Sequence, residues 1–269
     1  MCRDFSRYAN PMPRLAANLS MLFTEVGFLE RFAAARKAGF RAVEYQYPYD
    51  FKPDDVAAAA REAGVQVVLH NVPRGDSQRG EHGTACLPGR EQAFRRDLER
   101  AVAYARAAGC PRVHCLAGVI PPQADRRELH ATYLANLRHA AGVLKREGMQ
   151  LLIEPVSERT AKNYFLGGSA QAIAVLEELA ADNAFLQYDF FHMQILEGNL
   201  AEKAQRLLPR IGHMQVADAP GRHEPGSGEI NYGFLLRHVD AIGYAGWIGC
   251  EYNPAGDTVE GLKWAIPFL

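Results

Sequence analysis

Two short apolar segments of this chain each end in a glutamate. Residues 151–156 read LLIEPV and place Glu154 at the end of an apolar run, and residues 247–252 read WIGCEY and place Glu251 in the same way. A pair of positioned carboxylates can carry out general acid–base chemistry, in which one removes a proton and the other delivers one. We therefore interpret the two glutamates as parts of a single site.

Acidic and amide side chains also end the apolar segments between these two. In chain order, the last four such segments end with Glu154, Asp189, Gln215 and Glu251. A single acid in such a place more often caps a helix or pairs with a base, but four in succession indicate a site. Three carboxylates that converge in a poorly solvated mouth raise one another's pKa values unless a cation lies among them. Carboxylate and amide oxygens suit Mg²⁺ or Mn²⁺, so a divalent metal site is predicted at these four residues.

Further polar residues at the ends of apolar segments are candidates for contacts with a substrate. His70 ends an early segment, and His192 and Asp218 end two late ones. Each histidine is interpreted as a contact to a substrate oxygen, although a lone histidine at a strand end is as often a structural group. Glu44 ends another segment, and the pattern alone assigns it no role.

Two long glycine-rich loops, residues 73–90 and 219–233, follow two of these segments. Loops of this length beside a site usually form its walls or a lid. Four arginines in them are candidate partners for a substrate carboxylate, because a guanidinium pairs with such a group through two hydrogen bonds. They are Arg74, Arg79, Arg90 and Arg222, with Arg222 as the first choice; for any single one, a solvated loop charge is the more common role.

The elements that must position these residues alternate between strands and helices. Eight near-continuously apolar segments, typical of parallel strands covered on both faces, lie at 14–22, 42–48, 65–72, 112–118, 149–156, 184–192, 211–218 and 247–252. Amphipathic segments at 25–40, 91–109, 128–148 and 169–182 lie between them, and the first three end near Gly39, Gly109 and Gly148. The pattern predicts a single-domain α/β protein, a (β/α)8 TIM barrel, with an open doubly wound sheet as the alternative. In a TIM barrel the carboxyl ends of all strands meet at one mouth, where the site is predicted.

Composition excludes several other classes of protein. The chain has 269 residues, 48% of them hydrophobic, and a net charge of -1, and it contains no long basic run that would bind nucleic acid. It has no apolar run of about 20 residues, so no membrane span is predicted. Its five cysteines are scattered without a CxxC pair, which is typical of reduced thiols in the cytoplasm. Residues 1–11 are interpreted as a disordered leader before a domain at 12–269, with Met12 as an alternative start.

The chain resembles the hydroxypyruvate isomerase family of the xylose isomerase-like barrels, which also includes the 2-oxo-tetronate isomerases. The resemblance runs from about Pro13 to Trp264 and is carried by ANLSMLF (17–23), LPGRE (87–91), LLIEP (151–155), QYDFFHMQ (187–194), HMQVAD (213–218), RHEPGSGEINY (222–232) and GWIGCEY (246–252). It implies a divalent metal held by Glu154, Asp189, Gln215 and Glu251, with the two glutamates as proton donor and acceptor.

The activity implied by the resemblance is a metal-dependent aldose–ketose isomerisation of small hydroxy-oxo acids. Hydroxypyruvate would become tartronate semialdehyde by ene-diolate proton transfer between the two glutamates, with His70, His192, Asp218 and Arg222 as substrate contacts. Residues 23–40 are more similar to the 2-oxo-tetronate isomerases, whereas residues 69–76 and 215–226 are more similar to the hydroxypyruvate isomerases, so the substrate is left open between them. The expected partner is a small hydroxy-oxo acid, with no nucleic acid and no membrane, and a homo-oligomer is left open.

Three other functions are less consistent with the residues. The related ketose 3-epimerases carry a histidine where Gln215 stands and a further glutamate where Thr160 stands. An abasic-site endonuclease on the same barrel would require more histidine ligands and a basic face. A catalytically inactive sugar-acid binding protein would not require both Glu154 and Glu251.

Overall fold

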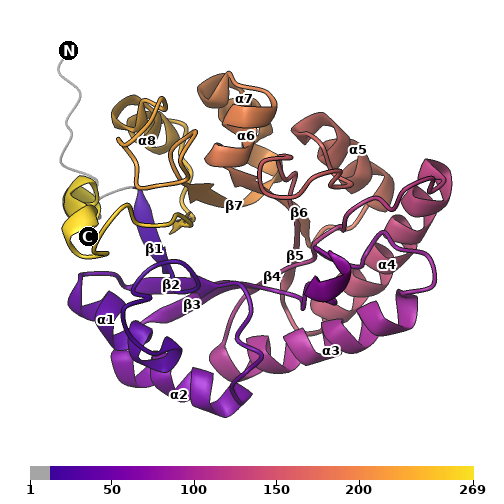
Figure 1. Ribbon diagram of the computed structural model, residues 1–269, viewed down its shortest axis with the longest axis horizontal. Helices are drawn as coiled ribbons and strands as arrows, with labels where there is room; N and C mark the ends of the chain where they lie inside the picture. The colour runs from indigo at the N-terminus through magenta and orange to yellow at the C-terminus, as the bar shows by residue number, and fades with distance from the viewer. Residues whose placement is uncertain (1–12) are drawn as a thin grey trace.

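The computed structural model describes residues 13–269, except for the side chain of Ser77. Eight parallel strands close into a barrel in chain order, with helices around it (Figure 1). The predicted (β/α)8 TIM barrel is therefore confirmed. The leader predicted at residues 1–11 and the alternative start at Met12 lie outside the described residues.

Each strand lies within one of the eight apolar segments but is shorter, because the segments continue into the loops at the mouth. Pairing of Arg14 with Trp247 and of Ala17 with Cys250 joins the last strand to the first and closes the barrel. The strands are β1 (Arg14–Asn18), β2 (Ala42–Tyr45), β3 (Gln66–Asn71), β4 (Arg112–His114), β5 (Gln150–Ile153), β6 (Ala184–Asp189), β7 (Ile211–Val216) and β8 (Trp247–Cys250).

The helices lie between the strands and cover the outside of the barrel. The three glycines predicted at helix ends, Gly39, Gly109 and Gly148, have positive φ angles of 107°, 64° and 69° and allow the chain to turn back toward the next strand. The α-helices are α1 (Arg31–Lys37), α2 (Pro53–Ala63), α3 (Glu91–Ala108), α4 (Arg126–Arg146), α5 (Ser169–Leu179), α6 (Phe190–Leu196), α7 (Leu200–Leu207) and α8 (Tyr232–Ala241). Short 3-10 helices are η1 (Phe28–Glu30), η2 (Ser77–Arg79), η3 (Leu208–Arg210), η4 (Glu260–Trp264) and η5 (Ile266–Phe268).

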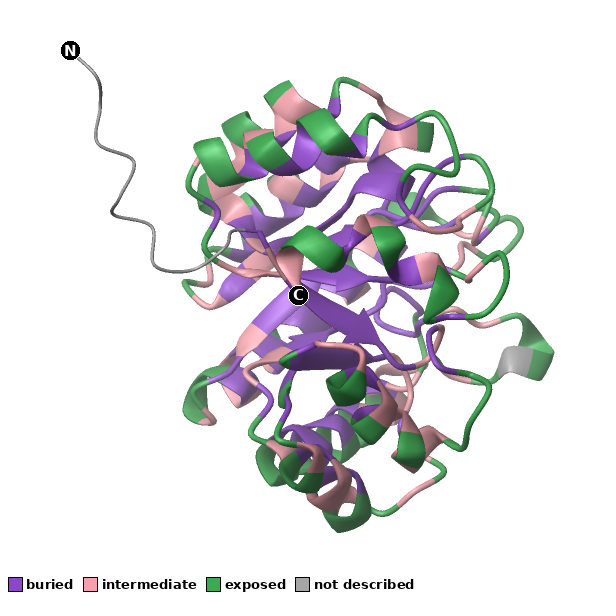
Figure 2. Cartoon of the chain, turned by 90° about the vertical axis from the view of Figure 1, so that its left-hand side faces the viewer, coloured by how far each residue is buried: buried purple, intermediate pink, exposed green. Residues whose placement is uncertain are grey.

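The strands form the buried centre of the molecule, whereas the helices expose one face to solvent (Figure 2). The cysteines of the described residues, Cys86, Cys110, Cys115 and Cys250, are buried free thiols. Cys115 and Cys250 pack in the hydrophobic core. Within residues 13–269, no helix is long and apolar enough to cross a membrane.

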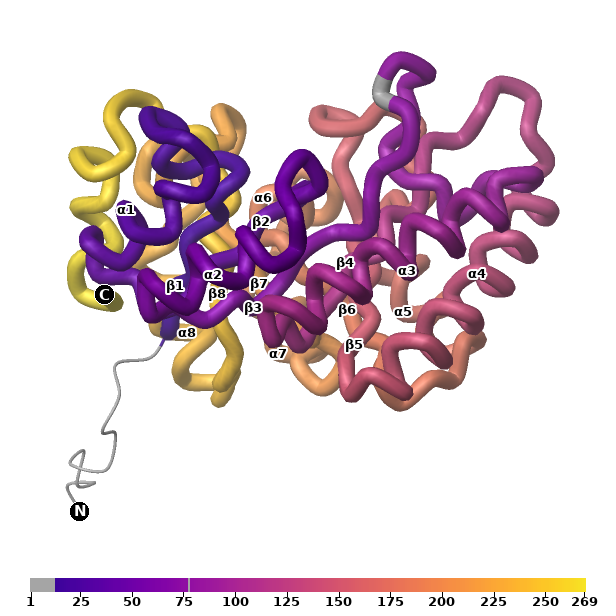
Figure 3. Tube along the Cα trace, turned by 90° about the horizontal axis from the view of Figure 1, so that it is seen from below, coloured from indigo at the N-terminus to yellow at the C-terminus, as the bar shows by residue number. Residues whose placement is uncertain are grey.

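The loop between β3 and α3 projects from the end of the barrel where the strands have their carboxyl ends (Figure 3). The backbone N–H of Gly83 donates to the carbonyl of Arg74 at 2.8 Å and closes the base of this loop. Gly83 has a φ of 105°, and a Cβ atom there would come within 2.5 Å of the Leu116 carbonyl oxygen. Glycine at this position therefore lets the loop lie directly against the segment that follows β4.

Candidate active site

A cavity of about 280 Å³ lies at the carboxyl ends of the strands. Five of the residues predicted from strand ends and loops line it: Arg74, Glu154, His192, Arg222 and Glu251. Asp189 is fully buried and contacts this group from below. Other lining residues come from the ends of β2, β3 and β4 and the loops after them, and include Gln46, Tyr47, Asn71, His82 and His114.

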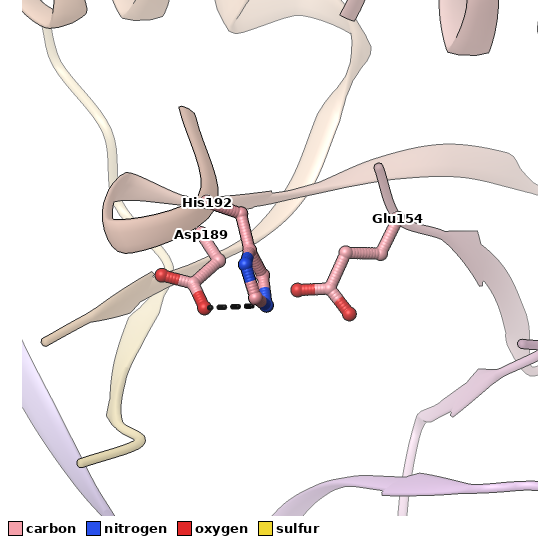
Figure 4. Close-up of side chains that lie close together, drawn as sticks. All are labelled: Glu154, Asp189 and His192. Carbon is pink, nitrogen blue, oxygen red and sulfur yellow. Dashed lines mark ion pairs between the residues drawn. The ribbon is translucent and has the colours of Figure 1, made fainter. Parts of the chain in front are cut away.

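Glu154, Asp189 and His192 form a buried group in which one potential ligand atom of each lies within 4.8 Å of the others (Figure 4). Glu154 Oε1 and Asp189 Oδ2 are buried and have no hydrogen-bond partner within the described part of the chain. Buried polar atoms are almost always hydrogen-bonded, so these two unpaired carboxylate oxygens indicate a binding site for a ligand or an ion. Two hard anionic oxygens fit a divalent cation.

The direct junction of β6 and α6 fixes two members of this group. Asp189 is the last residue of β6 and the N-cap of α6, where its Oδ1 accepts a hydrogen bond from the N–H of Phe191 at 2.8 Å. Its second oxygen, Oδ2, is left facing Nε2 of His192 at 3.6 Å. Because His192 lies in the first turn of the helix, no flexible loop separates the two side chains.

The hydrogen bonds of His192 define its tautomer. The backbone N–H of Ser157 donates to His192 Nδ1 at 3.3 Å, and a backbone N–H can only donate, so Nδ1 accepts. Burial, with Arg222 as the next cause, lowers the pKa of His192 well below its usual value. The ring is therefore neutral with its proton on Nε2, and it can donate to an oxygen in the cavity.

Glu251 forms an ion pair with Arg222. Its Oε2 accepts a hydrogen bond from Arg222 at 2.7 Å, and its Oε1 accepts one from Gln46 at 2.7 Å. The guanidinium of Arg222 also donates to the hydroxyl of Thr160 at 3.2 Å and lies 3.9 Å from Asp189. One arginine thus lies between the acids of β6 and β8.

The three acids of the mouth have raised pKa values. Burial raises the pKa of Glu154 well above its usual value, and the nearby Glu251 and Asp189 raise it further. Burial also raises the pKa of Asp189 to about 7 and that of Glu251, in both cases against the opposing effect of Arg222. A single arginine therefore leaves negative charge in the mouth that a bound cation would stabilise.

Gln215 lies below the cavity, beside Asp189, its partner in the pairing of β6 and β7. Its Nε2 donates to Glu44 Oε1 at 2.8 Å, and its Oε1 accepts from Gln187 at 2.6 Å. All four predicted metal ligands are thus at the same end of the barrel: Glu154 and Glu251 line the cavity, and Asp189 and Gln215, which pair in register, lie outside its lining.

The structure places two predicted substrate contacts, His70 and Asp218, outside the cavity lining. His70 packs against Tyr45 and Tyr49, with ring-centre distances of 6.0 and 6.4 Å, and burial lowers its pKa to about 4. The carboxylate of Asp218 instead accepts hydrogen bonds from the backbone of the following loop. The donors are the N–H groups of Ala219, Gly226 and Ile230, at 2.9, 2.8 and 3.0 Å.

The four loop arginines have different environments. Arg79 pairs with Asp76 at 3.5 Å in the projecting loop, and Arg90 pairs with Glu81. Arg74 and Arg222 line the cavity. Arg74 lies over the ring of Tyr47 at 5.4 Å, and within residues 13–269 it forms no ion pair.

The structure also brings to the mouth residues that the sequence pattern did not single out. Asn18 ends β1 and donates to Glu44 at 2.9 Å and to Glu251 at 3.4 Å. Gln46 follows β2 and donates to Glu251. Both lie inside the longer apolar segments 14–22 and 42–48, and the strand bounds of the structure are what place them at the mouth.

Comparisons with known proteins agree with this architecture. Residues 32–268 match the family model described as xylose isomerase-like TIM barrel. The 2-oxo-tetronate isomerase of Pectobacterium atrosepticum is 46% identical over 258 residues, which cover 96% of this chain and 98% of that protein. The hydroxypyruvate isomerase of Escherichia coli is 42% identical over 257 residues, which cover 96% of this chain and 100% of that protein.

Solved structures share the fold over nearly the whole chain. A crystal structure described as AP endonuclease, family 2, from Brucella melitensis superimposes with a TM-score of 0.93 at 40% identity, over 96% of this chain and 99% of that chain. An L-ribulose 3-epimerase superimposes with a TM-score of 0.74 at 23% identity, over 94% of this chain and 86% of that chain, and shows the fold alone.

Proposed function

This chain belongs to the hydroxypyruvate and 2-oxo-tetronate isomerase family of the xylose isomerase-like TIM barrels, and on that premise we propose that it isomerises a three- or four-carbon 2-oxo acid. Hydroxypyruvate is the first candidate substrate, and a 2-oxo-tetronate is the second. The observation that carries the proposal is the convergence of Glu154 and Glu251 on one cavity of about 280 Å³ beside the buried Asp189 and His192.

We assign a divalent cation, Mg²⁺ or Mn²⁺, to Glu154, Asp189, Gln215 and Glu251. The unpaired Glu154 Oε1 and Asp189 Oδ2 support this assignment, and the oxygen-rich set favours a hard cation over zinc. When bound, such a cation would polarise the substrate carbonyl and stabilise the negative charge of an ene-diolate. His192 takes a different role, because its Nε2–H is a donor and suits a substrate oxygen.

The two glutamates move the protons. In hydroxypyruvate, one carboxylate removes a proton from C3, and the electron pair of that C–H bond forms the C2–C3 double bond while the carbonyl oxygen becomes an ene-diolate oxygen. The facing glutamate delivers a proton to C2, the hydroxyl on C3 passes its proton to the oxygen on C2, and a C3 carbonyl forms while the C2 oxygen becomes a hydroxyl. The product is tartronate semialdehyde. A 2-oxo-tetronate undergoes the same steps with a hydroxymethyl group in place of one hydrogen on C3.

Two arginines divide the remaining contacts with the substrate. Arg222 bonds to Glu251 and lies near Asp189, so we place it at the reacting oxygens. Arg74 lies over Tyr47, at the β2–β3 side of the mouth, and has no acidic partner among the described residues. We assign the substrate carboxylate to Arg74, since a guanidinium beside a partly buried ring can form a bidentate pair with it.

His70 and Asp218 receive structural roles in this proposal. Asp218 holds the loop that carries Arg222, because its carboxylate accepts three backbone N–H groups of that loop. An endonuclease activity, suggested by the description of the Brucella structure, does not fit the residues of this site. Within the described residues, His192 is the single histidine of the potential metal group, and a phosphodiester site of that kind would require more.

A substrate panel tests the proposal. Purified protein would be freed of metal by chelation, reconstituted with Mg²⁺ or Mn²⁺, and assayed with hydroxypyruvate and with both enantiomers of 2-oxo-tetronate. We expect turnover with metal and none without it, and the ratio of kcat/KM values identifies the substrate. Absence of turnover with all of these acids, at saturating metal, would contradict the proposal.

A further inference from the structure

A second carboxylate network lies directly below the mouth and is centred on Glu44. Glu44 is the penultimate residue of β2 and is 1% exposed. Its Oε1 accepts hydrogen bonds from Asn18 at 2.9 Å and from Gln215 at 2.8 Å, and its Oε2 accepts one from His213 at 2.6 Å. The proton transfer described above does not use Glu44, so this buried acid requires a separate explanation.

The barrel leaves a specific place for this carboxylate. Gly249 in β8 faces it, and a Cβ atom at this position would collide with both carboxylate oxygens of Glu44. The strand pairing places Gly249 beside Gln215 and places Asn18 beside Glu44. Residues of β1, β2, β7 and β8 therefore enclose the carboxylate, and its position is fixed by the register of the strands.

A carboxylate can only accept hydrogen bonds, whereas the amide of a glutamine has a donor end and an acceptor end. The amide nitrogen of Gln215 must therefore face Glu44. Its oxygen must face the other way, where Gln187 donates to it at 2.6 Å. The reversed amide would present its NH₂ group where the oxygen now lies, on a residue paired with Asp189, and an NH₂ group does not bind a cation.

We propose that Glu44 is a positioning residue that orients the amide of Gln215, so that oxygen and not nitrogen is offered to the metal. The inference rests on the assignment of Gln215 as a metal ligand under the proposed function. The same logic extends to Asn18, whose amide nitrogen donates both to Glu44 and to Glu251 at 3.4 Å. One buried acid thus sets the orientation of one ligand directly and supports a second through an amide.

The affinity of the metal-free protein for Mn²⁺, measured from the electron paramagnetic resonance signal of free Mn²⁺, tests this role without an activity assay. Glu44→Gln keeps the shape of the side chain but replaces one acceptor with a donor. We expect it to weaken Mn²⁺ binding about 10–100-fold, the usual effect of losing a group that orients a ligand. Thermal unfolding of the same variant shows whether the fold is retained.

A compensating change separates positioning from a general structural role. Gln215→Glu makes the ligand symmetric, so its orientation no longer matters, and the double variant Glu44→Gln with Gln215→Glu keeps the total charge of the pair. We expect the double variant to regain Mn²⁺ affinity to within about threefold of the wild type. Glu197→Gln, the same substitution at a helix cap outside the cavity lining, is the matched control and should leave Mn²⁺ affinity unchanged.

The outcomes are distinct. Unchanged Mn²⁺ affinity in Glu44→Gln, or no recovery in the double variant, would overturn the positioning role while leaving the proposed function in place. A wild-type protein that binds no Mn²⁺ would overturn the metal assignment and this inference with it. If Glu44→Gln does not fold, Gly249→Ala presses a methyl group onto the same carboxylate and carries the same expectation and the same contradicting result.

Discussion

Arg222 donates a hydrogen bond to Glu251 at 2.7 Å, whereas Oε1 of Glu154, across the same mouth, has no partner within residues 13–269. The two glutamates are therefore chemically unequal. Burial raises the pKa of both carboxyl groups, but at Glu251 the directly bonded Arg222 is the main opposing effect, whereas at Glu154 the neighbouring Glu251 and Asp189 add to the rise. An unequal pair can supply one acceptor and one donor of protons at the same pH.

The first prediction concerns this pair. Glu154→Gln and Glu251→Gln should each reduce kcat about a thousandfold or more, because each removes a proton-transfer group and changes the charge around the cation. The double variant should be little slower than either single variant, since both groups act on one intermediate. Near-wild-type turnover by either single variant would contradict the pair mechanism.

Isotope exchange gives an independent measurement of the same step. Turnover in D₂O should place deuterium on the carbon that receives the proton, provided that the abstracting glutamate exchanges its proton with solvent before delivery. A variant that keeps the abstracting base and loses the donor should exchange the substrate C–H without forming product. Transfer of hydrogen between the carbons without exchange in wild type and in both variants would instead indicate a hydride shift.

Removal of the metal should abolish turnover, and Mg²⁺ or Mn²⁺ should restore it. Asp189→Ala should lose most of the metal affinity, because Asp189 contributes a fully buried oxygen that accepts no hydrogen bond from the described residues. Metal content by elemental analysis, measured beside kcat, checks both expectations. Full activity in a preparation shown to be metal-free would exclude the assigned role.

The two cavity arginines should differ in their effects. Arg222→Ala removes the ion-pair partner of Glu251. It should lower kcat/KM by an amount that corresponds to a loss of roughly 2–4 kcal/mol of transition-state stabilisation. Arg74→Ala should mainly raise KM, since it removes a charged partner of the substrate carboxylate. The rise should correspond to a loss of about 1.5–3 kcal/mol of binding free energy. Arg79→Ala is the matched control, because Arg79 is exposed and pairs with Asp76 in the projecting loop. If KM of the Arg74→Ala variant changes by less than about threefold, Arg74 does not bind the substrate carboxylate, and Arg222 is the alternative partner.

A pH-dependent stability effect is expected at Glu197. Its carboxylate accepts hydrogen bonds from the Ser169 hydroxyl at 2.8 Å and from Lys203 at 2.7 Å, and so ties the start of α5 to the segment after α6. Burial alone would raise its pKa, but these partners outweigh burial and lower the pKa below the ordinary value of 4.5.

A lowered folded-state pKa means that the stabilisation is present above the unfolded-state pKa and is lost as the pH falls through the folded-state value. Glu197→Gln should therefore lower the free energy of unfolding by about 1–3 kcal/mol at pH 7. The difference from wild type should narrow below about pH 4. Urea unfolding at several pH values measures this, and a difference that is constant from pH 7 to pH 3 would contradict the assignment.

The fold and much of the mouth follow from a simple sequence signal, a polar residue at the end of an apolar run. This signal brought Glu154, Asp189 and Glu251 to one end of the barrel, because parallel strands in a closed barrel share a carboxyl end. The same signal singled out Asp218, which lies in the loop beyond Val216, the last residue of β7, where its carboxylate accepts backbone hydrogen bonds.

Side-chain direction was not predictable in the same way. Strands covered on both faces are apolar at every position, so their sequence does not show which residues point into the barrel. The pairing of β2 with β3 also shifts between Val43 and Glu44, and a shift of one residue exchanges the inner and outer faces. His70 consequently packs against tyrosines, whereas Glu44 lies at the centre of the polar network.

The hydrogen bond at the base of the β3–α3 loop divides this segment into fixed ends, which include Arg74, and an outer part that projects from the barrel. Because the N–H of Gly83 is bonded to the carbonyl of Arg74, residues 75–82 form an excursion whose two ends are fixed beside each other. Insertions or labels in the outer part of such a loop do not change the position of its two fixed ends. A fluorophore attached at the exposed Gln78 would therefore offer a way to follow ligand binding while Arg74 stays in register with the barrel.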